Sequence, residues 1–138
     1  MKLSKNDDIK LNIDSLTSEG SGIGRFDGFA VFVRGVVPGD EVVAHIIKCS
    51  KNYAIGVVKD IIKPSEFRIE SDCPVSSKCG GCSFRNVSYD EELRYKKGRV
   101  QDALERIGKL DIEVEEIIGA DKCSHYRNKA QYPVSICD

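Results

Sequence analysis

Hydrophobic and polar residues alternate with the period of β-strands through the first half of the chain. Alternating runs occur at residues 9–13, 29–33, 42–46 and 53–57. Turn-forming residues separate them, and Val37-Pro38-Gly39-Asp40 makes a turn before the third run. Because residues 9–63 contain no helical pattern that would cover a sheet face, we expect the strands to close into a small barrel, which buries that face and removes the edges.

A cluster of glycines precedes the second run. Residues 19–25 have the sequence Glu-Gly-Ser-Gly-Ile-Gly-Arg, which invites comparison with a phosphate-binding loop. The cluster lacks the Gly-Lys-Ser/Thr ending, and it links two predicted strands where a nucleotide site needs a following helix. We therefore interpret it as a tight, glycine-rich hairpin that breaks the chain between strands.

Residues 89–107 carry the pattern of one amphipathic helix. Ser88 and Glu91 have the spacing of a capping box, and Gly108 is a typical C-terminal cap. An apolar stripe at helical spacing comprises Leu93, Val100, Ala103, Leu104 and Ile107. The cations within residues 94–99 fit a solvated helix face better than a nucleic-acid contact.

Alternation returns over residues 126–136 and predicts a half-buried strand. Arg127, Lys129 and Gln131 lie on its polar face, opposite a mainly apolar face that includes Tyr132. Two cations and an amide in a row suit contacts with phosphates and a base edge of RNA, or simply the solvated side of a strand. The pattern alone favours neither interpretation.

The overall charge gives no general attraction to nucleic acid. The 138 residues include 21 Lys and Arg against 22 Asp and Glu, a net charge of −1, and no apolar run approaches the length of a membrane span. An RNA-binding surface must therefore come from local sorting of charge. Arg25, Arg34 and Lys51 fall in or near loops of the predicted barrel, where they either contact a phosphate backbone or remain solvated.

Three cysteines gather between residues 73 and 82, in the sequence Cys-Pro-Val-Ser-Ser-Lys-Cys-Gly-Gly-Cys. Two intervening residues bring the sulfurs of Cys79 and Cys82 towards one centre, and the glycines allow close backbone approach. This spacing favours an iron–sulfur site, one thiolate short of a full set. Zinc is the alternative, with Cys123 or His125 as the fourth ligand. Disulfides are disfavoured because the charged N-terminal residues do not resemble an export signal.

Together these motifs resemble a known family. The glycine cluster, the strand at 29–33 and the turn at 36–42 are similar to a TRAM domain, a small OB-like RNA-binding barrel. The cysteine loop, the helix after it and Tyr126-Arg127-Asn128-Lys129-Ala130 resemble the region C-terminal to that domain in RNA (uracil-5-)-methyltransferases of the 23S rRNA type. The resemblance covers the whole chain in the right order.

The resemblance implies an S-adenosylmethionine-dependent enzyme that methylates C5 of a uridine in RNA through a cysteine nucleophile that adds to C6. In that family the nucleophile, the base and the cofactor pocket belong to a C-terminal Rossmann-like domain, and this chain has no glycine-rich dinucleotide fingerprint. We therefore expect an N-terminal fragment that contains no catalytic or cofactor-binding residues and is inactive alone.

The resemblance also assigns the cysteines. Cys73, Cys79 and Cys82 match the first three ligands of a [4Fe–4S] cluster, whose fourth ligand is expected beyond Asp138, with Cys123 as the alternative. The family often has a glutamine three residues after the third cysteine, where this chain has Arg85. The resemblance therefore assigns no base-contacting role to Arg85. The cluster is expected to organise the RNA-binding domain, since this methyl transfer needs no electron.

The expected architecture is mainly β with one helix: an OB-like TRAM barrel at 1–64 followed by the start of a small α+β iron–sulfur and RNA-recognition domain at 65–138. We expect a cytoplasmic monomer that binds rRNA. A stand-alone RNA-binding module and part of a tRNA uracil-5-methyltransferase are the alternatives. Radical methylthiotransferases also carry a TRAM domain, but their cysteines have a C-x3-C-x2-C spacing that this chain lacks.

Overall fold

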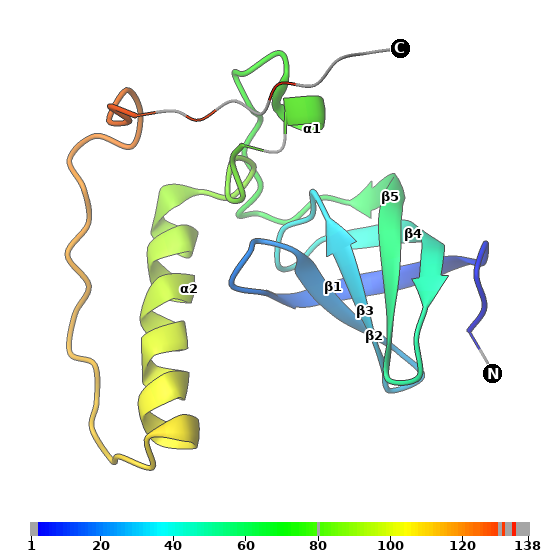
Figure 1. The fold of residues 1–138 in the computed structure, drawn as a ribbon, viewed down its shortest axis with the longest axis horizontal. Coiled ribbons are helices and arrows are strands. Elements are labelled where there is room, and N and C mark those ends of the chain that lie inside the picture. The colour runs from blue at the N-terminus through cyan, green and yellow to red at the C-terminus, as the bar shows by residue number, and fades with distance from the viewer. Residues whose placement is uncertain (1–2, 80, 130, 132–133, 135–138) are drawn as a thin grey trace. The chain divides into compact units, whose positions relative to one another are not determined.

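A computed structural model describes residues 3–79, 81–129, 131 and 134. It divides into two compact units, residues 1–96 and residues 97–138, and each is described by itself. The first unit contains all the strands and the cysteine loop (Figure 1).

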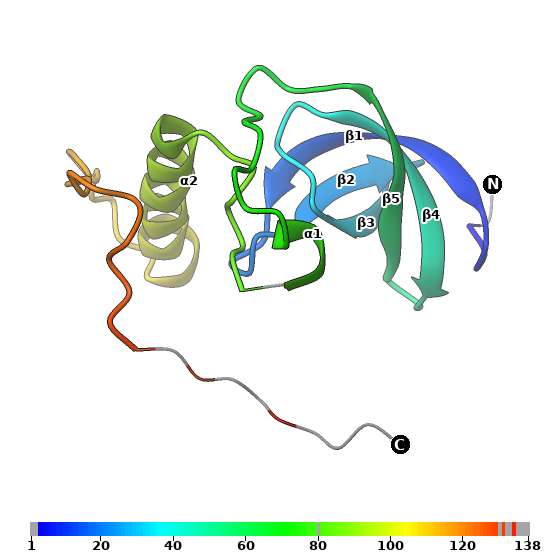
Figure 2. The same cartoon turned by 90° about the horizontal axis from the view of Figure 1, so that it is seen from above.

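Five strands form a closed barrel, which confirms the predicted barrel of a mainly β fold. They are β1 (Asp8–Leu16), β2 (Gly22–Phe26), β3 (Phe29–Arg34), β4 (Glu41–Cys49) and β5 (Tyr53–Lys63). The order around the barrel is β1-β2-β3-β5-β4, and β4 closes back onto β1. The strands curve around a common interior (Figure 2). All pairs are antiparallel except β3 and β5, which run parallel.

The barrel interior is filled by the apolar positions of the alternating pattern. Each strand turns every second side chain inward, so the period-2 pattern becomes one apolar core. The buried core residues are Ile9, Leu11, Ile13, Val31, Val33, Val36, Val42, Ala44, Ile46 and Ala54. The four predicted runs thus coincide with β1, β3, β4 and β5. In β5, however, the predicted apolar positions Tyr53, Ile55 and Val57 lie on the outer side, and the small residues Ala54 and Gly56 face the interior.

Strand β2 was not predicted, because its glycines were interpreted as strand breakers. Gly22 and Gly24 instead lie within the strand, at positions where the barrel wall leaves no room for a side chain. A Cβ at Gly22 would lie 2.1 Å from Cγ2 of Val36, and a Cβ at Gly24 would lie 2.4 Å from the backbone oxygen of Asn12. A turn of residues 17–21 does join β1 to β2, and no helix comes directly after β2, but residues 22–25 of the predicted hairpin belong to a strand.

The helical prediction holds with a change at its C-terminal end. A four-residue helix, α1 (Ser76–Cys79), lies in the cysteine loop, and α2 (Tyr89–Asp102) continues into a π-helical turn, η1 (Ala103–Ile107). Gly108 is the C-cap, and its N–H donates to the backbone oxygen of Ala103. No residue of α2 or η1 is fully buried. Along the apolar stripe, Leu93 and Leu104 are half-buried, and Val100, Ala103 and Ile107 are exposed.

In the second unit, the segment after η1 is tied to the helix by Gln101. Its side-chain amide donates to the backbone oxygen of Ile112 over 3.0 Å and accepts from the N–H of Val114 over 2.7 Å. Lys97 donates to the backbone oxygen of Glu115. No helix within the described residues combines the length and apolar character that a membrane crossing requires.

Candidate nucleic-acid interface and cysteine loop

The outer face of β2 and β3 carries two of the predicted RNA-binding cations. Val31 and Val33 are completely buried, so Arg34 must face outward with the even-numbered residues of β3. Arg25 of β2 pairs with Ala30 of β3 and therefore shares this outer face. Both arginines are exposed. The barrel thus brings together two cations from neighbouring strands.

These three cations are not held by ion pairs among the described residues. Within the described part of the chain, Arg25, Arg34 and Lys51 take part in no ion pair, and the sequences of β2, β3 and residues 53–59 contain no Asp or Glu. Lys51 lies in the exposed turn between β4 and β5. Arg25 also lines a shallow surface pocket whose other residues include Asp14 and Glu41. Arg34 and Lys51 are therefore the more fully available cations of the three.

Lys59, by contrast, is engaged on another part of the barrel wall. Its ammonium group pairs with the carboxylate of Asp8, which also contacts Nδ1 of His45 at 2.7 Å. Hydrogen bonds from Lys59 and then from His45 lower the pKa of Asp8 below its usual value. Lys59 is therefore held by a protein anion and contributes less to any RNA-binding surface than Arg34.

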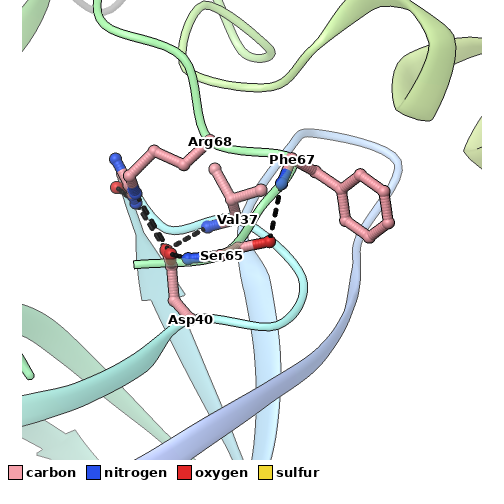
Figure 3. A network of polar contacts seen from close by, with 6 residues as sticks. Val37, Asp40, Ser65, Phe67 and Arg68 are labelled. Carbon is pink, nitrogen blue, oxygen red and sulfur yellow. Dashed lines mark hydrogen bonds and ion pairs between the residues drawn. The ribbon is translucent and has the colours of Figure 1, made fainter. Parts of the chain in front are cut away.

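A buried carboxylate fixes the segment immediately after the barrel (Figure 3). Asp40 is 1% exposed and accepts hydrogen bonds from the N–H groups of Val37 at 2.7 Å and Ser65 at 2.9 Å. The guanidinium group of Arg68 donates to both carboxylate oxygens, and also to the backbone oxygen of Gly35. Sequence reasoning recognised the turn that contains Asp40 but not its partner, because the two residues are 28 positions apart.

The ionisation of Asp40 depends on these donors. Burial by itself would raise the pKa of the carboxyl group. The side-chain hydrogen bonds from Arg68, together with those from the backbone N–H groups of Ser65 and Val37, outweigh burial and lower the pKa of Asp40 below its usual value. Asp40 is therefore charged at neutral pH, and its charge holds residues 65–68 against the barrel.

The cysteine loop is closed at its base. Arg68 and Val87 form an antiparallel bridge, the N–H of Ile69 donates to the backbone oxygen of Asn86, and that of Ser88 donates to Phe67. A second apolar cluster supports the base, with Leu16, Val37 and Val87 buried and Phe67, Phe84 and Tyr95 packed against them. The loop therefore leaves and re-enters the same anchored point beside the barrel.

Contacts inside the loop involve Arg85, which lies three residues after Cys82. Arg85 pairs with the carboxylate of Asp72, and its Nε donates to Oγ of Ser71 over 3.3 Å. The N–H of Cys73 also donates to Oγ of Ser71. Arg85 thus connects the two sides of the loop near the first cysteine.

The glycine-rich turn of the barrel contacts this loop directly. Gly20 has a φ of 78° and is buried, and a Cβ there would lie 2.6 Å from the backbone oxygen of Ser83. Ser83 is the residue directly after Cys82. Only glycine permits both this backbone conformation and this close approach.

The three clustered cysteines have the right chemistry for a metal centre but are not gathered in the structure. Cys73 is half-buried, Cys79 and Cys82 are exposed, and all three are free thiols. Sγ of Cys79 lies 3.4 Å from where a Cβ at Gly81 would be, so the glycine leaves space beside it. Among the described residues, no three His, Cys, Asp or Glu side chains form a ligand group. Soft thiolates on an anchored loop fit an iron–sulfur cluster, provided that they converge when it binds.

The remaining predicted site residues lie in the second unit. Cys123 is an exposed free thiol, and Arg127, Lys129 and Gln131 are exposed as well. The described residues between 126 and 134 belong to no helix or strand, whereas Ala130, Tyr132, Pro133 and residues 135–138, Cys137 among them, lie outside the described residues. The predicted strand at 126–136 therefore stays a prediction.

Comparisons with known proteins agree with this architecture. The TRAM domain family matches residues 6–59, which include most of the five strands. An uncharacterized RNA methyltransferase of Listeria monocytogenes is 46% identical over 132 residues, covering 96% of this chain and 29% of that protein. One of Clostridium tetani is 45% identical over 130 residues, covering 94% of this chain and 28% of that protein. The chain thus spans less than a third of the length of these relatives.

Among solved structures, the tRNA (uracil-54, C5)-methyltransferase of Pyrococcus abyssi in complex with S-adenosyl-L-homocysteine has a TM-score of 0.45 and 22% sequence identity. The match covers 75% of this chain and 22% of that one.

Proposed function

We propose that this chain is the RNA-recognition part of an S-adenosylmethionine-dependent RNA (uracil-C5) methyltransferase that acts on 23S rRNA. Two findings support the proposal: the TRAM domain family matches residues 6–59, and relatives named RNA methyltransferases match nearly the whole chain. The observation that carries the proposal is the outer face of β2 and β3, which holds Arg25 and Arg34. Neither arginine forms an ion pair within the described residues, and neither strand contains an acidic residue. Such a face attracts a phosphate backbone despite the net charge of −1.

The division of labour is inferred from the chain's share of its relatives. Residues 1–64 are the RNA-binding barrel, and residues 65–138 begin a domain that carries the cysteine loop and the polar residues Arg127, Lys129 and Gln131. The cysteine nucleophile, the general base and the S-adenosylmethionine pocket are assigned to the part of the relatives that this chain does not span. The protein is proposed to act as a monomer in the cytoplasm.

Cys73, Cys79 and Cys82 are proposed as three ligands of a [4Fe–4S] cluster, with the fourth thiolate supplied from outside this chain. The anchored base of the loop supports the proposal, because ligands on a closed loop lose less conformational freedom when they converge. When bound, the cluster would fix the geometry of the loop. That geometry would in turn position Ser83 against Gly20 of the barrel.

The first experiment tests substrate and activity in a protein that continues this chain to the full length of its relatives, called the longer protein below. Purified protein is incubated with S-adenosylmethionine and either 23S rRNA or tRNA, and 5-methyluridine is measured by nucleoside mass spectrometry. We expect 5-methyluridine in 23S rRNA alone. Product in tRNA alone would favour the tRNA enzyme, and RNA binding without product would favour a stand-alone module. Methyl transfer by residues 1–138 alone would contradict the proposed division of labour.

The second experiment tests the metal centre. The longer protein, purified without oxygen, should be brown and contain iron and sulfide, and Cys79→Ser should lose both. Cys49→Ser is the matched control, because Cys49 is an exposed free thiol at the end of β4, away from the cysteine loop. Stoichiometric zinc without iron would contradict the cluster and promote Cys123 as the fourth ligand.

A further inference from the structure

Two aromatic rings lie against each other on the outer wall of the barrel. The ring centroids of Phe32 on β3 and Tyr53 on β5 are 5.6 Å apart, and the ring planes meet at 76°. Both side chains face outward, since their strand neighbours Val31, Val33 and Ala54 are completely buried. Tyr53 is 37% exposed. The parallel pairing of β3 with β5 therefore places an aromatic pair on the surface.

This pair contributes little to the barrel core. Phe26 and Phe29 are the aromatic side chains that pack against the buried core residues, whereas Phe32 and Tyr53 do not belong to that cluster. Phe29 lies on the same strand as Phe32 but faces inward, like Val31 two residues later. The strand thus uses one phenylalanine to fill the interior and displays another on the surface.

The residues around the pair are apolar beside Phe32, where the register places Ile23 and Ile55, and comprise a small side chain and cations elsewhere. The register aligns Arg25, Ala30 and Tyr53 across three adjacent strands, so alanine separates the arginine from the tyrosine. Neighbouring strands are about 4.8 Å apart, which puts roughly 10 Å between the Arg25 and Tyr53 backbones. Arg34 comes two residues after Phe32 on the same face. An aromatic surface is therefore flanked by a cation on either side.

We propose that this face is a stacking site for the bases of single-stranded RNA. The ring of Tyr53, supported by the edge of Phe32, would stack on a base over Ala30, while Arg25 and Arg34 contact the flanking phosphates. Charge complementarity favours RNA as the occupant, since Arg34 and Arg25 flank the rings outside any ion pair of the described residues, on strands without acidic residues. Asp14 and Glu41 line the same pocket as Arg25, so Arg34 is the main phosphate contact. The inference deepens the proposed function and rests on it.

The test separates base stacking from phosphate binding in the 138-residue chain. Fluorescence anisotropy compares a labelled oligouridylate with a ribose-phosphate oligomer of the same length that lacks bases. Stacking of one base corresponds to about a tenfold tighter Kd, or about 1.4 kcal/mol. We expect this preference for the oligouridylate in the unmodified chain, and its loss in Tyr53→Leu. Arg34→Gln should weaken binding of both oligomers alike.

Phe29→Leu is the matched control, because it removes an inward ring from the same strand. It should lower the melting temperature and keep the preference for bases. Crosslinking with 4-thiouridine provides a second measurement that does not depend on the folding of a variant. We expect crosslinked peptides to contain Phe32 or Tyr53, and crosslinks confined to other peptides would overturn the proposal.

The outcomes distinguish this inference from the function it rests on. Equal affinity of the unmodified chain for the two oligomers would refute stacking while leaving RNA binding in place. No binding of either oligomer would contradict the proposed function itself. A change in oligomeric state caused by Tyr53→Leu, with RNA affinity unchanged, would assign the aromatic face to a contact between two copies of the chain and overturn the proposal.

Discussion

Replacing Asp40 by asparagine tests the buried ion pair that joins the barrel to the segment after it. The carboxylate accepts from two backbone N–H groups and from two nitrogens of Arg68. Asparagine has nearly the same shape but offers one acceptor oxygen, and its NH2 group would face donors. The substitution therefore removes the charge and leaves hydrogen-bond donors unpaired without creating a cavity.

The expected loss of stability depends on the burial of both partners. The side chain of Asp40 is 0% exposed and that of Arg68 is 16% exposed. Removing one member of a buried ion pair costs about 3–5 kcal/mol. The partial exposure of Arg68 lets water reach its free end, so we expect a cost of about 3 kcal/mol, at the lower end of that range. For a chain of this size that corresponds to a melting temperature lower by roughly 10 °C.

The effect should depend on pH in a defined direction. The folded-state pKa of Asp40 lies below its unfolded value of about 3.9. The charged form is therefore favoured by folding, and its stabilisation is complete above that unfolded pKa and lost as the pH falls through the folded pKa. The difference in stability between the unmodified chain and Asp40→Asn should thus be constant near neutral pH and shrink below about pH 4.

Urea unfolding monitored by circular dichroism, repeated at neutral pH and at about pH 2.5, measures this difference. Asp8→Asn is the matched control, since it makes the same chemical change in an exposed carboxylate paired with Lys59 and His45. We expect its unfolding midpoint at neutral pH to match that of the unmodified chain. Equal midpoints for Asp40→Asn and the unmodified chain at neutral pH, or a difference that persists unchanged in acid, would refute the reasoning.

Three further changes test other parts of the chain. Gly24→Ala should lower the free energy of unfolding in urea by about 1–3 kcal/mol, because the added Cβ meets backbone in the barrel wall. Gly98→Ala on α2, where a Cβ meets open space, should instead raise it by about 0.5–1 kcal/mol, and equal effects would contradict the steric account. Tyr95→Phe removes a 2.7 Å hydrogen bond to the backbone oxygen of Leu16 and should cost about 1 kcal/mol in the same assay, so an unchanged midpoint would count against that bond. Arg127→Ala should weaken RNA binding and lower the slope of log affinity against log salt by about one, without altering the melting temperature; an early melt would instead indicate a structural role.

Local sequence pattern was enough for the strands that alternate and for the barrel they form. Period-2 alternation depends only on which side chains must leave water, so β1, β3 and β4 could be predicted from the positions of their apolar residues. The same pattern located β5 but assigned its inward face wrongly, because the closed barrel buries Ala54 and Gly56 and leaves Tyr53 and Val57 exposed. The turn at 37–40 and the long helix beginning at Tyr89 were recognised from the local preferences of proline, glycine and capping residues. The candidate metal ligands were likewise identified by the spacing of the cysteines alone.

Long-range contacts decided the rest. Gly22 and Gly24 had the signature of a break, but the close approach of Val36 and of the neighbouring strand makes glycine the residue that fits within β2. The partner of Asp40 could not be predicted locally, because Arg68 reaches the carboxylate only through the antiparallel pairing of β4 with β5. The aromatic pair on the outer wall likewise exists only through the parallel register of β3 and β5. Strand alternation is a property of each segment, whereas pairing, register and the neutralisation of a buried charge arise only when distant segments meet in space.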